Sequence, residues 1–236
     1  MALLTATDPD KTSWMLPFDP PFDPNNPFPL ADGISYSDAQ LHAEAVDSWL
    51  GLETGRIENE LLKRHENVGQ ELWIGLPTRS LLTPYTEIRE LLARLKPAAG
   101  ATIVDLGAGY GRMGHVIGRH YPEVRFIGYE YVKERVLEAR RCLAKFEYPL
   151  VEIQETDLAS NDFEPTPADY YFLYDYGARS AVEKTLQDLR KIAKARSISV
   201  IARGRLSRDV VERQHPWLSG VLVPSHYPHY SIYRSS

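Results

Sequence analysis

A glycine-rich stretch near the middle of the chain has the residue types of a ligand site. The run Ile-Val-Asp-Leu at 103–106 predicts a β-strand, and glycines follow it at alternating positions, Gly107, Gly109 and Gly111. Glycine lets backbone N–H groups approach a ligand closely, and the start of a following helix favours an anionic group. We therefore expect a ligand at this turn rather than an ordinary tight connection between a strand and a helix.

Two ligand classes fit this turn. Gly109, Gly111 and Gly114 spell GxGxxG, the pattern of dinucleotide sites, so a nicotinamide or flavin enzyme is one alternative. Asp105 favours the other class, because a carboxylate beside a pyrophosphate would repel it. S-adenosylmethionine presents an ammonium and a sulfonium there and carries no phosphate, so its site tolerates the acid.

Further acids follow the apolar runs that come later in the chain. Three of them share this position, each within three residues after the end of an expected strand: Glu130, Asp157 and Asp175. In an open parallel sheet, ligands bind outside the carboxyl ends of the strands. We therefore expect these acids to lie near the glycine-rich turn.

Together these features resemble the class I (Rossmann-like) S-adenosylmethionine-dependent methyltransferases, over residues 102–233. The resemblance implies S-adenosyl-L-methionine as the cofactor. Gly107 and Gly109 would admit its methionine moiety, Glu130 would accept from both ribose hydroxyls, and Asp157 would accept from the adenine amino group. No metal site is expected. The residues that the resemblance assigns to the cofactor within the core are Asp105, Gly107, Ala108, Gly109, Glu130, Tyr131, Asp157 and Leu158, with Tyr131 or Leu158 flanking the adenine ring.

The segment 77–85 is similar to the lid loop of non-SET protein lysine methyltransferases. This similarity implies that Thr83 and Tyr85 close over the methionine end of the cofactor. The alternative for Thr83 is a cap on the helix that follows it.

The acceptor side of the site is expected at Asp175 and Tyr176, which would position the acceptor and deprotonate it. The same similarity favours a protein amino group of the lysine type as the acceptor. A small-molecule acceptor, or a cofactor-binding partner protein without catalysis, are the alternatives. Arg203 would pair with a substrate carboxylate or with a nearby acid.

Alternating strand and helix patterns beyond Pro97 predict an α/β fold. The expected architecture is a doubly wound, seven-stranded, mostly parallel sheet with an antiparallel last strand. Strands are expected at 102–106, 125–129, 150–154, 170–174, 197–202, 220–223 and 230–233, and helices at 112–119, 133–145, 181–195 and 208–214.

The chain before this core divides into two expected parts. Residues 1–36 form an acidic, proline-rich arm, which is expected to be extended and pinned by Trp14, Phe18, Phe22 and Phe28. Residues 37–97 form a helical lid segment that begins at Ser37 as an N-cap and contains helical patterns ending before Pro97. The resemblance implies that residues 98–236 form the S-adenosylmethionine-dependent methyltransferase domain.

Charge, cysteine content and hydropathy limit the binding partners and the cellular compartment that we expect for the chain. The formal net charge is -5, so strong nucleic-acid binding is not expected. The single cysteine has no partner for an internal disulfide, and no apolar run has the ~18 residues of a membrane helix. We expect a soluble, cytoplasmic protein without membrane association. The sequence gives no indication of the oligomeric state.

Overall fold

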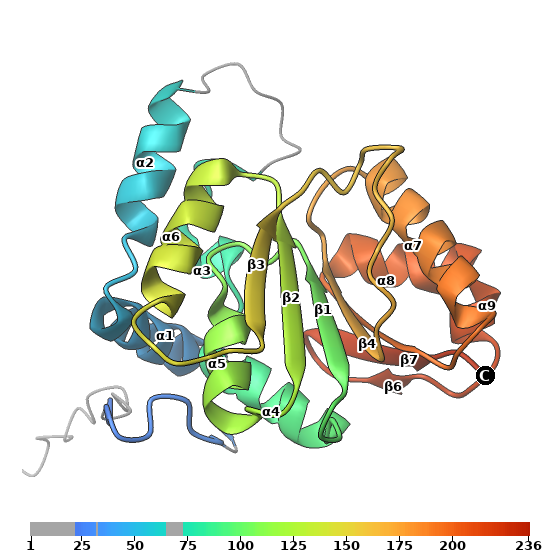
Figure 1. The fold of residues 1–236 in the computed structure, drawn as a ribbon, viewed down its shortest axis with the longest axis horizontal. Helices are drawn as coiled ribbons and strands as arrows, with labels where there is room; N and C mark the ends of the chain where they lie inside the picture. The colour runs from blue at the N-terminus through green and yellow to red at the C-terminus, as the bar shows by residue number, and fades with distance from the viewer. Residues whose placement is uncertain (1–21, 32, 65–72) are drawn as a thin grey trace, which may run out of the picture.

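A seven-stranded sheet forms the centre of the molecule (Figure 1). The computed structural model describes residues 22–31, 33–64 and 73–236. The strand order is β3-β2-β1-β4-β5-β7-β6. The five strands from β3 to β5 pair in parallel, and β7 is antiparallel to β5 and β6. The predicted mostly parallel sheet with an antiparallel last strand is confirmed.

The strand bounds agree with the sequence pattern to within about two residues in the parallel part of the sheet. The strands are β1 Thr102–Leu106, β2 Arg125–Glu130, β3 Val151–Glu155, β4 Tyr170–Tyr174, β5 Ser199–Arg203, β6 Ser225–His226 and β7 Tyr230–Arg234. The strand predicted at 220–223 was wrong. The N–H of Gly220 closes helix α9 (Pro216–Ser219) on the Pro216 carbonyl at 2.9 Å, so residues 220–222 continue in a turn and bend.

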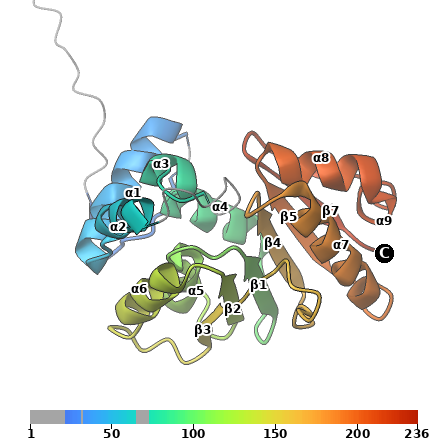
Figure 2. The same ribbon diagram turned by 90° about the horizontal axis from the view of Figure 1, so that it is seen from above.

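Helices cover both faces of the sheet, because each central strand directs alternate apolar side chains to opposite sides. Ile103 of β1 packs in one cluster with α4 (Tyr85–Leu95), α5 (Arg112–His120) and α6 (Lys133–Leu143). Its neighbour Val104 packs in a second cluster with the other set of helices: α7 (Arg179–Ala193), α8 (Arg205–Gln214) and α9. The two helix groups stand on opposite sides of the strands in Figure 2. The fold is therefore doubly wound, as predicted.

The segment before the sheet is helical and packs on the side of α5 and α6 (Figure 2). It contains α1 (Tyr36–Leu50), α2 (Thr54–Arg64), α3 (Thr78–Leu81) and α4. The predicted N-cap at Ser37 was wrong by two residues. Ser35 caps α1, because its hydroxyl accepts from the N–H of Asp38 at 3.2 Å.

Two phenylalanines of the proline-rich arm pin it to the body of the protein. Phe28 is 1% exposed and stacks on Tyr85 with ring centroids 5.2 Å apart. Phe22 lies 5.7 Å from the Trp49 ring of α1. The predicted contacts of Trp14 and Phe18 lie outside the described residues.

Candidate functional site

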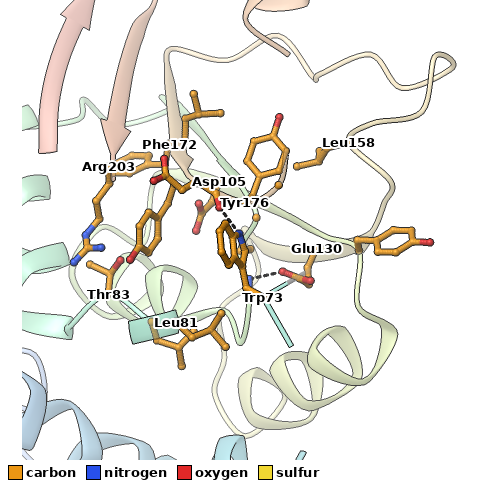
Figure 3. Close-up of a pocket in the computed structure, with 18 of the residues that line it drawn as sticks. Trp73, Leu81, Thr83, Asp105, Glu130, Leu158, Phe172, Tyr176 and Arg203 are labelled. Carbon is orange, nitrogen blue, oxygen red and sulfur yellow. Dashed lines mark hydrogen bonds between the residues drawn. The ribbon is translucent and has the colours of Figure 1, made fainter. Parts of the chain in front are cut away.

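A pocket of about 590 Å³ opens at the carboxyl ends of the parallel strands, in the range of small-molecule and cofactor sites. Figure 3 shows Arg203 and Phe172 toward one end of it and Leu158 toward the other, with Asp105 and Trp73 between them. Residues from β1, β2, β4 and β5 line one side, and residues from α3 and α4 line the other. The helical segment therefore forms part of the pocket wall.

The glycine-rich turn forms the floor of this pocket. Gly107 has φ of 95°, and Gly109 and Gly111 have φ of 54° and 73°, which are left-handed values that favour glycine. A Cβ at Gly107 would come within 2.5 Å of the Tyr176 Cβ. The N–H groups of Gly107 and Ala108 both donate to the Tyr129 carbonyl, at 2.9 and 2.8 Å. These bonds tie the turn to the end of β2, and its glycines present no side chains to the pocket.

Glu130 ends β2 and is held in one position by the backbone. Its Oε2 accepts from the N–H of Gly109 at 2.9 Å, and its Oε1 accepts from the N–H of Val132 at 2.9 Å. The Nη1 of Arg135 lies 3.8 Å from Oε1. Glu130 is only 6% exposed, yet it lines the pocket. Its carboxylate is therefore an oriented acceptor at the pocket wall.

Asp105 lies at the end of β1, on the floor of the pocket. Loss of hydration raises the pKa of its carboxyl to about 7, and the negative charge of Glu130 adds to that rise. A cationic ligand placed beside Asp105 would lower this pKa again. The Asp105 carboxyl therefore favours a positively charged ligand group at the floor of the pocket.

The residues predicted for the adenine end come together at the edge of the pocket near β3. Tyr131 is 51% exposed, Leu158 is 5% exposed, and both line the pocket with Asp157. The Oδ1 of Asp157 accepts from the N–H of Ala159 at 2.9 Å. The exposed carboxylate of Asp157 keeps further acceptor capacity on the solvent side.

Asp175 lines the pocket, but its carboxylate is engaged by the start of α8. Its Oδ1 accepts from the N–H and the hydroxyl of Ser207, both at 2.7 Å, and its Oδ2 accepts from the N–H of Leu206 at 3.2 Å. The side chain therefore satisfies the free N–H groups of the first turn of α8. Asp175 is a helix-capping residue at the mouth of the pocket.

Tyr176 turns its hydroxyl away from the pocket. The hydroxyl donates to the Ala181 carbonyl at 3.0 Å and lies 2.6 Å from the Thr185 hydroxyl of α7. Burial raises the pKa of this hydroxyl above its usual value. The part of Tyr176 that meets the glycine-rich turn is its Cβ, close to Gly107.

The lid-loop residues separate in the structure. Thr83 lines the pocket, and its carbonyl accepts from Nη1 of Arg112 at 3.0 Å. It does not cap α4, which begins after Pro84 without a side-chain cap. Tyr85 is fully buried, and its hydroxyl donates to Oδ1 of Asp47 at 2.8 Å. The structure thus places Tyr85 in the core, outside the pocket lining, because its ring packs on Phe28.

The end of the pocket beyond the glycine-rich turn is apolar with one ion pair at its wall. Arg203 at the end of β5 donates to both carboxylate oxygens of Glu87, at 2.7 and 3.1 Å, and lies 4.4 Å from the centroid of the Tyr174 ring. The predicted pairing of Arg203 with a nearby acid is thus present. The apolar side chains at this end come from α4 and the sheet: Ile88, Leu91, Phe172 and Ile201.

The pocket lining includes residues that were not predicted from the sequence, among them Trp73, Arg112 and Arg135. Arg112 directly follows Gly111 and pairs with Asp47, and Arg135 pairs with Glu58 at 2.8 Å. The position of Arg112 directly after the glycines was a usable signal. Arg135 and Trp73 reach the pocket only through tertiary packing, so local sequence carries no sign of their role.

Among the described residues, no group of three or more His, Cys, Asp and Glu side chains is arranged to hold a metal ion. Within the same part of the chain, the helices are too short or too polar to cross a membrane.

Comparison with known proteins gives one partial sequence match. No family model matches the chain. A segment of 78 residues is 38% identical to trans-aconitate 2-methyltransferase of Methylobacterium nodulans. This matched segment covers 33% of this chain and 28% of that protein. The chain therefore matches little more than a quarter of the length of this curated relative.

Solved structures give distant likenesses. An RNA methyltransferase from Salinibacter ruber in complex with S-adenosyl-L-homocysteine is 21% identical, with a TM-score of 0.47 over 65% of this chain and 92% of that chain. A methyltransferase from Escherichia coli is 17% identical, with a TM-score of 0.49 over 65% of this chain and 88% of that chain.

The predicted resemblance rests on the sheet, the glycine-rich turn and the matched sequence segment. The mostly parallel, seven-stranded sheet with an antiparallel β7 is the one expected from it, and the curated relative is a methyltransferase. The chain therefore has the sheet that the resemblance to the class I (Rossmann-like) S-adenosylmethionine-dependent methyltransferases implies, and one third of it matches a methyltransferase in sequence.

Proposed function

We propose that the chain binds S-adenosyl-L-methionine and transfers its methyl group to an amine acceptor. The observation that carries the proposal is the juxtaposition of a bare glycine-rich turn with two buried or partly buried carboxylates, Asp105 and Glu130. The cofactor supplies an already activated methyl group on a sulfonium. The protein's part is to bind the cofactor, to align the acceptor and to exclude water.

The charges of the pocket suit a cationic ligand. Asp105, Glu130, Asp157, Asp175 and Glu87 all line it, and so do the three arginines Arg112, Arg135 and Arg203. Each of these arginines already faces a carboxylate: Asp47, Glu58 and Glu87, respectively. The remaining acids favour the sulfonium and ammonium of S-adenosylmethionine over the pyrophosphate of a dinucleotide.

Within the pocket, Asp105 would face the ammonium, and Gly107 to Gly109 would pass under the methionine moiety. Glu130 would accept from the ribose hydroxyls with the oxygen lone pairs that Gly109 and Val132 leave free. Asp157, Leu158 and Tyr131 would hold the adenine. Thr83 completes the wall on the helical side.

The acceptor is proposed to be an amine, with the lysine side chain of a protein as the first candidate. An ammonium has no lone pair, so the proton must leave before attack on the methyl group. Asp175 supplies negative charge at the mouth, where it would draw the amine in, while its carboxylate oxygens stay bound to α8. Tyr176 would contribute its backbone rather than its hydroxyl, which is bonded to α7.

The partial relative acts, by its name, on trans-aconitate, which is a carboxylate. A polycarboxylate acceptor needs cations that have no other partner, whereas Arg203 at the apolar end of this pocket is paired with Glu87. This pairing favours an amine over a carboxylate acceptor. The apolar lining by Phe172 and Ile201 suits the methylene chain of lysine, and a small apolar amine is the second candidate.

The test is to incubate the purified chain with methyl-labelled S-adenosylmethionine and a lysate of its own source, and to separate the products by size. Label in protein bands that survives hot acid supports a protein amino group. Label confined to small molecules supports the second candidate. The Glu130→Ala chain serves as the control, because it keeps the acceptor end and loses the ribose acceptor. Tight cofactor binding with no labelled product in any fraction would favour a partner-binding protein without catalysis.

A further inference from the structure

Trp73 crosses the mouth of the pocket and bonds to it at both ends. Its indole Nε1–H donates to the backbone carbonyl of Asp175, and its own carbonyl accepts from Nη2 of Arg135 at 3.5 Å. Trp73 is 36% exposed and lines the pocket (Figure 3). The residue is thus attached to two walls of the pocket.

The order of the strands shows what lies beneath it. Arg135 is in the first turn of α6, which follows β2, and Asp175 directly follows β4. Strand β1 lies between β2 and β4 in the sheet. A residue that connects the ends of β2 and β4 therefore passes over the end of β1, where Asp105 and the glycine-rich turn form the pocket floor.

The backbone conformation of Trp73 also indicates that contacts of its side chain hold it over the pocket. Its φ is 53°, a left-handed value that a bulky residue rarely adopts. The favourable contacts of the side chain must outweigh that backbone cost, because an unconstrained tryptophan would take an extended or helical value. The bond to the Asp175 carbonyl and the packing over the pocket provide such contacts.

We propose that Trp73 is a cofactor-binding residue that covers the groove above the glycine-rich turn and slows the release of the ligand held there. The inference rests on the proposed function, because it takes the ligand over Asp105 to be S-adenosylmethionine or its product. The indole excludes water from the groove on the side facing solvent. Excluding water strengthens the charge interactions of Asp105 and Glu130 with the ligand.

Two substitutions separate the contributions of the indole. Trp73→Gly removes the ring and accepts a φ of 53° without strain, so loss of binding cannot be assigned to a distorted backbone. Trp73→Phe keeps a smaller aromatic cover and removes the five-membered ring of the indole with the N–H that bonds to Asp175. The matched control is Trp217→Phe, because Trp217 lies on α9, outside the pocket lining, and donates its N–H to His215.

The experiment measures S-adenosylhomocysteine binding by calorimetry and its dissociation by stopped-flow displacement, with thermal unfolding as a check on each variant. For Trp73→Gly we expect the dissociation constant to rise by about tenfold, because the dissociation rate constant rises by about that factor while the association rate constant changes little. For Trp73→Phe we expect a dissociation constant between those of the parent and of Trp73→Gly. The Trp217→Phe chain should bind like the parent. A folded Trp73→Gly chain that binds as tightly as the parent, or more tightly, would overturn the proposal. If the parent itself does not bind S-adenosylhomocysteine, the proposed function fails instead.

Discussion

Asp47 and Arg112 form a buried ion pair between the helical segment and the helix that follows the glycine-rich turn. Their side chains are only 7% and 6% exposed, respectively, and Arg112 meets both carboxylate oxygens of Asp47. Oδ1 of Asp47 also accepts from the Tyr85 hydroxyl at 2.8 Å, and Arg112 donates to the Thr83 carbonyl at 3.0 Å. The pair thus fixes the pocket wall that contains Thr83 against the start of α5.

Asp47→Ala is expected to destabilise the protein by about 3 to 5 kcal/mol, because it leaves the Arg112 guanidinium buried without a counter-charge. Chemical denaturation measures the change. Glu44→Ala is the control, since Glu44 pairs with Arg79 on the surface, where both side chains are almost half exposed. Its cost should stay below about 1 kcal/mol. Equal effects of the two substitutions would show that the buried pair does not hold the segment.

Glu130→Gln is expected to weaken S-adenosylhomocysteine binding by about tenfold or more, because hydrogen bonds to a charged acceptor contribute roughly 1.5 to 3 kcal/mol each. Titration calorimetry checks the value. The control is Glu155→Gln, a change at the end of the neighbouring strand β3, where the side chain is exposed and outside the pocket lining. A Glu130→Gln chain that binds like the Glu155→Gln chain would remove Glu130 from the ribose site.

Binding of S-adenosylmethionine should depend on pH through Asp105. The pKa of this carboxyl is raised to about 7 in the unliganded protein, so a cationic ligand binds best to the ionised form above that pH. Affinity is expected to fall below pH 7, by up to about tenfold per pH unit, as the carboxyl takes up its proton. Calorimetry between pH 6 and 8 tests this, and Asp105→Asn should remove the dependence. A parent affinity that is constant across this range would contradict the role of Asp105.

The same carboxyl should make the unliganded protein less stable at high pH. Its folded pKa lies above the ordinary value of 3.8 because of burial, so its favourable contribution is complete below about pH 4 and is lost as pH rises through 7. Asp105→Asn is therefore expected to raise the melting temperature of the unliganded chain at pH 8 and to change it little at pH 4. Thermal scans at the two pH values measure the difference. A lower melting temperature at pH 8 for the variant would show that the charged form is stabilised.

Asp175 can be tested for a role beyond capping α8. Asp175→Ala should cost about 0.5 to 2 kcal/mol, the usual effect of losing an N-cap side chain. Asp175→Ser keeps a capping hydroxyl and removes the charge. If the charge draws in the amine acceptor, Asp175→Ser restores stability but keeps a raised KM for the acceptor. Parent-like kinetics for Asp175→Ser would limit Asp175 to the cap.

The sheet and the position of the glycine-rich turn and Glu130 at the pocket were predictable because their signals are local. A strand ending at Leu106, followed by left-handed glycines, is specified by a few adjacent residues. Glu130 ends its strand, and parallel pairing of β1 with β2 then brings it to the turn. Such features need only the periodicity of the strands and the rule that ligands lie at their carboxyl ends.

The helical side of the pocket depended on contacts between distant parts of the chain. Thr83 and Tyr85 are two residues apart, yet one lines the pocket and the other is buried on Phe28 of the arm. The hydroxyl direction of Tyr176 is set by the Ala181 carbonyl and Thr185 in α7. Trp73 reaches Asp175 across 102 positions of sequence. No local pattern predicts these pairings, because each depends on how the helical segment packs on the sheet.

The pocket is proposed to bind S-adenosylmethionine and not a dinucleotide. Calorimetric titration of the parent chain with S-adenosylhomocysteine, and separately with NADH, tests it most directly. The proposed site predicts one molecule of S-adenosylhomocysteine bound per chain and no heat of binding with NADH. Binding of NADH without any binding of S-adenosylhomocysteine would contradict the claim.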